Sequence, residues 1–302
     1  FINAGDFVLI NSYLLALSLP VTYIGYVFAE MYRSLSSLYG FFEFFDLVVA
    51  AEQNFSVAAF KNNSIEFKAV SYYHDNKEQI VDNISFSIEH GKSIAIIGVS
   101  GSGKSTCARL LLKLLEPTKG EITIGGENIK DISGYDIRSF IGFIPQEGTI
   151  FTGTLRDNLT YGCLNYQEED LKFAIKLLAF EKTIESLDKG LDTVIDESEF
   201  SNGEKQCISF IRAILRRAKI FIFDEPTTGL DPIMSNVIND LITKAREELD
   251  ATTITITHDI HSAKSIGVDV AFLRNGTINW VGSVKDMERH SSEELQKFIA
   301  GK

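Results

Sequence analysis

The sequence has 302 residues, of which 45% are hydrophobic and 23% charged, and its formal net charge is −12. These values describe a globular chain of one or two domains and exclude a broad basic surface, so we expect no nucleic acid among its main partners. The three cysteines, Cys107, Cys163 and Cys207, are too widely spaced for a metal-ligand pair or a disulfide framework. We expect them to be small core residues in a reducing compartment.

The chain opens with an apolar run, "FVLINSYLLALSLPVTYIGYV" at residues 7–27, and no charged side chain occurs between Asp6 and Glu30. As a helix rising ~1.5 Å per residue, this run is long enough to cross a hydrocarbon layer ~30 Å thick. Asn11 and Pro20 lower its hydrophobicity, so a long helix buried in a soluble core is the competing interpretation. Taken alone, the run leaves both interpretations open.

From about residue 63, short β-rich runs alternate with helical stretches. The runs include "SIEFKAV", "SIAIIG", "KIFIFDE" and "TTITITH". Strands that alternate with helices predict an α/β fold whose mixed, partly parallel sheet is covered by helices. Apolar residues at helical spacing between 165 and about 190 predict an inserted helical lobe, within a helical subdomain at about 150–218.

The stretch "SIAIIGVSGSGKSTCARLLLKLL" carries the most informative motif. Residues Gly98 to Ser105 satisfy the pattern G-x-x-x-x-G-K-[ST], with an apolar strand before them and an amphipathic helix after them. Glycines let the backbone wrap closely around phosphate groups, and the N–H groups at the start of the following helix point at the anion. We expect Lys104 to neutralise the β- and γ-phosphates of ATP and the Ser105 hydroxyl to bind Mg²⁺. The predicted ATP-binding residues here are Gly98, Ser100, Gly101, Ser102, Gly103, Lys104, Ser105 and Thr106.

A second stretch, "IFIFDEP", supplies acidic residues for the same site. Residues 220–223 are apolar throughout, as in a buried parallel strand, and Asp224 and Glu225 follow where strand ends meet ligands. We expect Asp224 to hold Mg²⁺, directly or through water. Glu225 is expected to accept a proton from the attacking water.

The order of the motifs resembles the nucleotide-binding domain of an ATP-binding cassette protein. The motifs are the phosphate loop, "PQE" at 145–147, "FSNGEKQ" at 200–206, "IFIFDEPTTGLD" at 220–231 and "TITITHD" at 253–259. The resemblance covers about residues 63–290. It implies that Gln146 contacts Mg²⁺ and the attacking water, that Asp231 communicates across a dimer, and that His258 contacts the γ-phosphate.

An aromatic platform for adenine is also implied by the resemblance. Members of the family often read V-x-F-x-Y ahead of the strand that leads to the phosphate loop. In the same register, "VSYYHD" places His74 at the stacking position with Tyr73 beside it, and either ring could stack on the base. Tyr72 is expected to fill the core instead.

The signature motif departs from the family pattern L-S-G-G-[QE], which opens a helix facing the γ-phosphate bound by the partner subunit. Residues 200–204 read "FSNGE" here, so Asn202 adds a side chain where the family has glycine, and Cys207 replaces the usual arginine. A hydroxyl and a backbone N–H can still point at phosphate. The residues expected to contact nucleotide at this motif are Ser201, Gly203 and Glu204. The departure predicts slower or altered turnover.

With a cassette downstream, the opening run resembles the last membrane helix of a fused exporter subunit. It is most similar to half-transporters of mitochondria and alphaproteobacteria that are linked to export of glutathione-related or iron–sulfur precursor compounds. The likeness rests on Gly5, Asp6, Asn11, "LSLP" and Gly25. The chain begins at Phe1 rather than Met, so we expect it to be a fragment, and the resemblance implies five earlier membrane helices upstream. The implied domains are residues 1–50 as membrane helix and cytosolic extension, 51–62 as linker, 63–290 as nucleotide-binding domain and 291–302 as C-terminal tail.

The sequence therefore predicts the ATP-hydrolysing half of an exporter of a small molecule. Two halves, identical or related, would sandwich ATP in a mitochondrial or bacterial inner membrane, with the nucleotide-binding domain on the cytosolic or matrix side. Glu225 would be the general base, and Lys104 and His258 would stabilise charge on the transferring phosphoryl group. The residues sharing Mg²⁺ would be Ser105, Gln146 and Asp224. Two alternatives stay open: a soluble cassette ATPase of DNA repair or translation, and a regulatory ATP-binding half with reduced hydrolysis.

Overall fold

A computed structural model of the chain describes residues 3–46, 60–74, 79–163, 166–287, 289 and 292–300. It divides the chain into two units, residues 1–54 and 55–302, and each is described by itself. Most of the predicted linker, residues 51–62, lies outside the described residues, which resume at Phe60.

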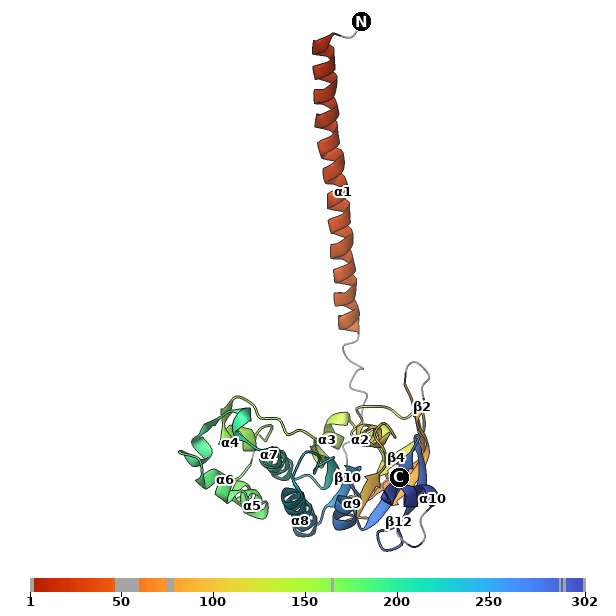
Figure 1. Ribbon diagram of the computed structural model, residues 1–302, viewed down its shortest axis with the longest axis vertical. Helices are drawn as coiled ribbons and strands as arrows, with labels where there is room; N and C mark the ends of the chain where they lie inside the picture. Colours follow the sequence, from red (N-terminus) through yellow and green to blue (C-terminus); the bar gives the residue numbers. More distant parts are fainter. Residues whose placement is uncertain are drawn as a thin grey trace. The chain divides into compact units, whose positions relative to one another are not determined.

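The described part of the N-terminal unit forms a long helix, α1 (Ala4–Asp46; Figure 1). The stretch Ala4–Tyr39 has a mean hydropathy of 1.7 in its most apolar window, none of which is buried. By length and composition this helix can cross a membrane, since ~20 apolar residues span a ~30 Å hydrocarbon core. Large apolar side chains such as Phe7, Leu14 and Val21 are exposed in the described part of the chain, whereas a helix in a soluble core would bury them.

The second unit contains a six-stranded sheet with the strand order β12-β11-β3-β10-β9-β6. Its strands are β3 (Ser93–Ile97), β6 (Ile141–Ile144), β9 (Ile220–Asp224), β10 (Thr252–Thr257), β11 (Asp269–Arg274) and β12 (Thr277–Ser283). All neighbours pair in parallel except β12, which is antiparallel to β11. β3 and β10 are buried along their whole length, as central parallel strands covered on both faces should be. The carboxyl ends of β3, β6, β9 and β10 therefore share one edge of the sheet.

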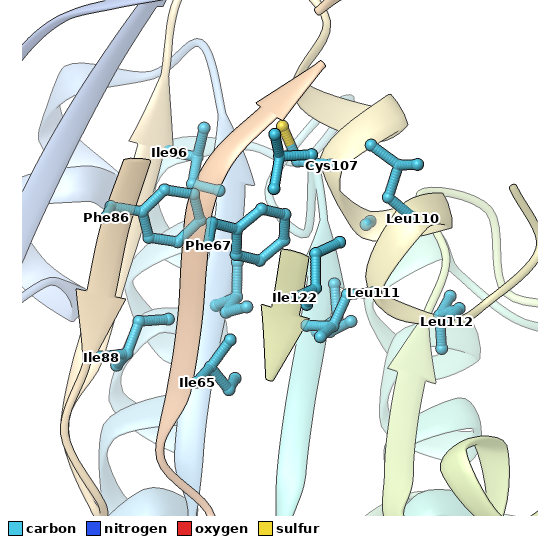
Figure 2. Close-up of a cluster of buried hydrophobic side chains, with 14 of the residues drawn as sticks. Ile65, Phe67, Phe86, Ile88, Ile96, Cys107, Leu110, Leu111, Leu112 and Ile122 are labelled. Atoms are coloured by element: carbon cyan, nitrogen blue, oxygen red, sulfur yellow. The ribbon is translucent and has the colours of Figure 1, made fainter. Parts of the chain in front are cut away.

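A four-stranded antiparallel sheet, of order β2-β1-β4-β5, packs beside the first. Its strands are β1 (Ile65–Tyr73), β2 (Gln79–Ile88), β4 (Lys119–Ile124) and β5 (Glu127–Asn128). Figure 2 shows the core cluster that joins this sheet to β3 and to helix α2 (Lys104–Leu111): Phe67 and Phe86 lie against Ile96, with Cys107 of α2 close by. This cluster anchors α2 by its apolar face, which fixes the position of the helix N-terminus.

A helical lobe lies at one end of the second unit in Figure 1. Its helices are α4 (Leu155–Leu159), α5 (Glu168–Leu177), α6 (Glu181–Glu185) and α7 (Asn202–Leu215), with a short strand pair of β7 (Gly153–Thr154) and β8 (Val194–Ile195). Leu171 and Ala174 of α5 are fully buried in one cluster with Ile208 and Ile211 of α7. The apolar residues at helical spacing in this stretch thus face a common core, as expected for the predicted helical lobe.

The remaining helices are α3 (Gly134–Phe140), α8 (Pro232–Leu249), α9 (Ile260–Ile266) and α10 (Glu293–Ile299), and short 3₁₀ turns cover 129–131, 190–192 and 197–199. Helix α10 lies within the predicted C-terminal tail, and its Leu295 is fully buried with Phe272 and Met287. The predicted fold class, an α/β fold with a mixed sheet, a helical part and an apolar N-terminal helix, is confirmed.

Candidate functional site

A cavity of about 600 Å³ brings together segments that are far apart in the sequence. Its walls include residues from the loops that follow β3, β6 and β9, as expected for the carboxyl edge of a parallel sheet. The lining residues are Gln79, Ile80, Ser100, Gly101, Gly103, Lys104, Ser105, Thr106, Gln146, Glu225, Asn275 and Gly276. The structure thus brings six of the eight predicted phosphate-loop residues together with Gln146 and Glu225, whereas Gly98 and Ser102 are not among the lining residues.

The loop after β3 needs glycine at two positions. A Cβ on Gly98 would lie 2.1 Å from the carbonyl oxygen of Leu273, and one on Gly103 would lie 2.9 Å from that of Ile80. Both residues also have positive φ angles, 155° and 102°, which disfavour other residue types. The loop is consequently pressed against β11 and β2, and α2 begins directly after it with free N–H groups at its N-terminus.

Lys104, the first residue of α2, folds back over this loop. Its side chain is buried, and Nζ donates to the carbonyl oxygens of Gly98 and Val99 at 2.9 and 3.0 Å. Burial lowers the pKa of Lys104, while the charges of Glu225 and Asp224 act in the opposite direction. The partners of the ammonium group are thus neutral carbonyl oxygens. An anionic phosphate can replace them, because its charge-assisted hydrogen bond with the ammonium is stronger.

Ser105 and Asp224 form the contact expected of a shared cation site. The Ser105 hydroxyl donates to Oδ1 of Asp224 at 3.2 Å, where β9 ends. Burial raises the pKa of Asp224, whereas the hydrogen bond from Ser105 lowers it. Hydroxyl, carboxylate and, from Gln146, amide oxygens are ligands that suit Mg²⁺. Within the described ranges, no group of three or more His, Cys, Asp and Glu residues could hold a metal by itself; Mg²⁺ is commonly bound by one or two carboxylates together with substrate phosphates and water.

Glu225 follows Asp224 and contacts His258. Oε2 of Glu225 lies 2.8 Å from Nδ1 of His258, and it accepts from the His258 backbone N–H at 3.2 Å and from the Thr228 hydroxyl at 3.3 Å. β9 and β10 are paired neighbours, which is why their next residues meet. Glu225 has a φ of 50°, a left-handed conformation that is uncommon for glutamate and recurs at functional sites.

The signature residues lie at the start of α7. Ser201 is the N-cap and forms a capping box with Glu204: the Ser201 N–H and hydroxyl donate to Oε2 of Glu204 at 2.9 and 2.7 Å. Asn202 is exposed, whereas Gly203 is buried, and a Cβ there would lie 2.9 Å from Cε of Met234. Glu204 thus holds the helix start in place.

Asp231 serves as the N-cap of α8. Its Oδ1 accepts from the backbone N–H groups of Ile233 and Met234 at 2.9 and 3.0 Å. Taken with the signature residues, it forms a group that was predicted to face a partner's nucleotide. None of Ser201, Gly203, Glu204 and Asp231 lines the cavity in the described part of the chain.

The mouth of the cavity differs from what the sequence suggested. Tyr73 ends β1 and His74 is exposed, but neither is among the lining residues, and residues 75–78 between β1 and β2 lie outside the described chain. Asn275 and Gly276 line it instead, and the Gly276 N–H donates to the Ser102 carbonyl at 3.2 Å. The signal available in the sequence was the Asn-Gly pair, which favours a tight hairpin turn.

The cysteines behave as buried thiols rather than as part of the site. Burial raises the pKa of Cys107 and of Cys207 to about 12, so both stay protonated at neutral pH. Cys163 is partly buried, and its pKa is also raised. All three are free thiols, as expected.

Comparison with known proteins extends these observations. Residues 81–228 match the ABC transporter family. The chain is 32% identical over 263 residues to the mitochondrial iron-sulfur clusters transporter ABCB7 of Oryzias latipes, an alignment that covers 85% of this chain and 35% of that protein. It is 37% identical over 224 residues to YwjA, an uncharacterized ABC transporter ATP-binding protein of Bacillus subtilis (strain 168), covering 73% of this chain and 38% of that protein.

A solved structure, that of a bacterial Atm1-family ABC exporter with ATP bound, superposes on the chain with a TM-score of 0.79 at 28% identity. The superposition covers 99% of this chain and 53% of that one, so the chain spans about a third to a half of the length of these proteins. Motif order, site geometry and similarity agree: the chain belongs to the ABC transporter family.

Proposed function

We propose that this chain is the ATP-hydrolysing part of an exporter half, in which ATP binding and hydrolysis at a dimer interface drive transport across a membrane. The observation that carries the proposal is the cavity where the phosphate loop, Gln146 and Glu225 meet, with His258 hydrogen-bonded to Glu225. Within one cavity, the loop after β3 supplies backbone N–H groups and the Lys104 ammonium for phosphate, and the loop after β9 supplies Glu225 as a candidate base. That combination is what phosphoryl transfer from ATP to water requires.

Each residue then has a definite task. The N–H groups at the start of α2 and the Lys104 ammonium hold the β- and γ-phosphates, while Glu225 accepts the proton of the attacking water. His258, which is hydrogen-bonded to Glu225 but is not among the residues that line the cavity, would contact the γ-phosphate. Ser105, Gln146 and Asp224 would hold Mg²⁺, which neutralises phosphate charge when bound.

A second chain would complete the site. The N-terminus of α7, with the Ser201 hydroxyl and the Gly203 N–H, has the character of an anion site, and it is separate from the chain's own cavity. We propose that it contacts the γ-phosphate held by the partner, and that Asp231 adjoins that interface. The partner is either a second copy or a related half.

The membrane domain would supply the other partner surface. A groove of about 200 Å³ includes Phe151, Tyr161 and Arg212 in its walls, and the Phe151 and Tyr161 rings stack at 4.2 Å. The Arg212 guanidinium donates to the carbonyl oxygens of Asn158 and Thr149 and to Oδ1 of Asn158. We propose this groove as the contact for a short segment of the membrane domain. Helix α1 would be the last membrane helix of that domain.

Substrate and compartment rest on similarity alone. The name of the Oryzias latipes relative supports a cargo related to iron–sulfur clusters, and a glutathione-related compound remains a proposal from the family resemblance. We place the protein in a mitochondrial or bacterial inner membrane, with the cassette on the matrix or cytosolic side. The net charge of −12 and the exposed apolar helix speak against the soluble alternative in DNA repair or translation.

The proposal is tested by measuring ATP hydrolysis of the purified chain in detergent over a range of protein concentrations. We expect Mg²⁺-dependent hydrolysis whose rate per chain rises with concentration, because each site needs a second chain. A measurable rate per chain that does not depend on protein concentration would contradict the proposal that two chains share each site. ATP binding without hydrolysis would favour the regulatory alternative.

The adenine platform gives a separate prediction. Tyr72 packs against the core cluster, whereas His74 is exposed at the end of β1. We expect His74→Ala to weaken ATP binding ~3- to 10-fold, the scale of a lost ring contact, and more than Tyr72→Phe, which keeps the core packing. Titration with a fluorescent ATP analogue measures both. An effect of Tyr73→Ala alone would shift the stacking position by one residue.

Asn202 gives a prediction whose sign is informative. Its amide nitrogen Nδ2 lies 3.6 Å from where a Cβ on Gly229 would be, so the side chain leans toward the loop before α8. Because Ser201 and the Gly203 N–H already provide donors, we expect Asn202 to be tolerated rather than required. Asn202→Gly should therefore raise turnover about 3-fold, which corresponds to ~0.7 kcal/mol. Lower turnover in Asn202→Gly would show that the amide bonds the nucleotide.

A further inference from the structure

The side chain of Gln206 joins α7 to the loop that carries Gln146. Gln206 lies in the second turn of α7 and is 5% exposed, and its Nε2 donates to the carbonyl oxygens of Pro145 at 2.8 Å and Gln146 at 2.6 Å. The reverse amide orientation would place Oε1 against two carbonyl oxygens, so the donor assignment follows from the geometry. One buried side chain therefore donates a hydrogen bond to each of the backbone carbonyls of Pro145 and Gln146.

A second contact presses the same loop onto the same helix. A Cβ on Gly148 would lie 2.4 Å from the carbonyl oxygen of Lys205 and 2.6 Å from its carbonyl carbon. Only glycine lets the backbone approach this closely. The loop is thus held by Gln206 through hydrogen bonds and by Gly148 through direct contact, two residues after Gln146.

The first turns of α7 link this contact to the signature. Asn202 and Gln206 are four residues apart, so they lie on the same face of the helix, ~6 Å apart along its axis. Ser201 and Glu204 hold the helix start through the capping box, and Gly203 packs against Met234 of α8. A rigid helical segment therefore connects the loop of one nucleotide cavity to the surface proposed to meet the partner's nucleotide.

We propose that Gln206 is a positioning residue that ties the Gln146 loop to the first turns of α7 and so keeps Gln146 in the cavity. This inference rests on the proposed function, because it assigns Gln206 a task in that same site. Gln206 does not reach the cavity lining itself and acts through the backbone of Gln146. Its role would be to connect cation positioning in one chain to the signature contact with the other.

Gln206→Met tests this directly, since it keeps the length of the side chain and removes both hydrogen bonds. We expect kcat for ATP hydrolysis to fall ~10-fold, the scale of losing buried hydrogen bonds, with KM for ATP changed less than ~2-fold because the phosphate loop is untouched. The Mg²⁺ concentration for half-maximal binding of a fluorescent ATP analogue, a readout that requires no turnover, should rise at least ~3-fold as Gln146 leaves its position. A merely structural role would not shift the Mg²⁺ requirement.

Gly148→Ala provides an independent perturbation, since its Cβ pushes the loop off Lys205 while Gln206 stays unchanged. We expect the same lower kcat and higher Mg²⁺ requirement. Gln167→Met, the same exchange at an exposed position without a side-chain capping bond, is the matched control and should behave like the unmodified chain. Binding of a fluorescent ATP analogue to each variant reports whether it is folded.

The outcomes separate this inference from the proposed function. Hydrolysis by the unmodified chain that Glu225→Gln abolishes supports the function. If Gln206→Met and Gly148→Ala then keep the Mg²⁺ requirement of the unmodified chain, the positioning role is wrong, whatever happens to kcat. A raised Mg²⁺ requirement in either variant that still binds ATP supports it.

Discussion

Replacing Glu225 with glutamine is expected to lower ATP hydrolysis ~10²- to 10⁴-fold while ATP binding stays intact. Loss of a general base commonly has an effect of this size. The exchange keeps the shape of the side chain, and the His258 N–H groups can still donate to its amide oxygen. Lys104, Ser105 and the glycines of the loop, which hold the phosphates, are unaffected.

Single-turnover hydrolysis and equilibrium ATP binding, measured on the same preparation, separate the two effects. Glu248→Gln makes the same chemical change at an exposed position on α8 and should leave both unchanged. Near-normal hydrolysis in Glu225→Gln would remove Glu225 as the base. Lost ATP binding would instead indicate that Glu225 holds the phosphate loop or Lys104 in place.

Replacing Lys104 with alanine is expected to weaken ATP binding ~10²-fold, the scale of losing a hydrogen bond between charged groups in a buried site. Lys104 lies in the cavity wall at the first residue of α2, with both of its hydrogen bonds directed to the loop that would cradle phosphate. Removing the ammonium takes away the charged side chain that holds the phosphates beside the backbone N–H groups of the loop.

Lys113 offers a matched control for this prediction. Its Nζ donates to the carbonyl oxygens of Lys130 and Ile132 at 3.0 and 2.7 Å, and burial lowers its pKa as it does for Lys104. Lys113 is not among the residues that line the cavity. Lys113→Ala should therefore leave ATP affinity unchanged. Equal loss of affinity in both variants would mean that Lys104 acts on folding rather than on phosphate.

Local patterns were enough to predict much of this fold. The run from Ile220 to Phe223 is apolar at every position, which is typical of a central parallel strand, and its two acidic residues then had to lie at the ligand edge of the sheet. Glycines before Lys104 similarly predicted a close approach of backbone to ligand, and Gly98 and Gly103 do contact other strands too closely for a Cβ.

Long-range partners were not visible in the same way. The Asn-Gly pair indicates the turn between β11 and β12, but no local pattern places β11 beside β3, and the contact of Gly276 with the phosphate loop depends on that pairing. Gln206 looked like an ordinary polar residue on an amphipathic helix, and only the packing of α7 against the Gln146 loop gives its amide two carbonyl partners. By contrast, the capping box of Ser201 and Glu204 has a local S-x-x-E pattern, and the contact of Glu204 with nucleotide stays a prediction.

The most direct test of the shared nucleotide site is the molecular mass of the Glu225→Gln chain in detergent, measured by light scattering with and without Mg²⁺-ATP. ATP should shift the protein from one chain to two, because trapped nucleotide joins the phosphate loop of one chain to the Ser201 region of the other. ADP should leave the mass unchanged, as should ATP added to the chain that also carries Lys104→Ala. A mass that does not respond to ATP, in protein that demonstrably binds ATP, would contradict the shared site.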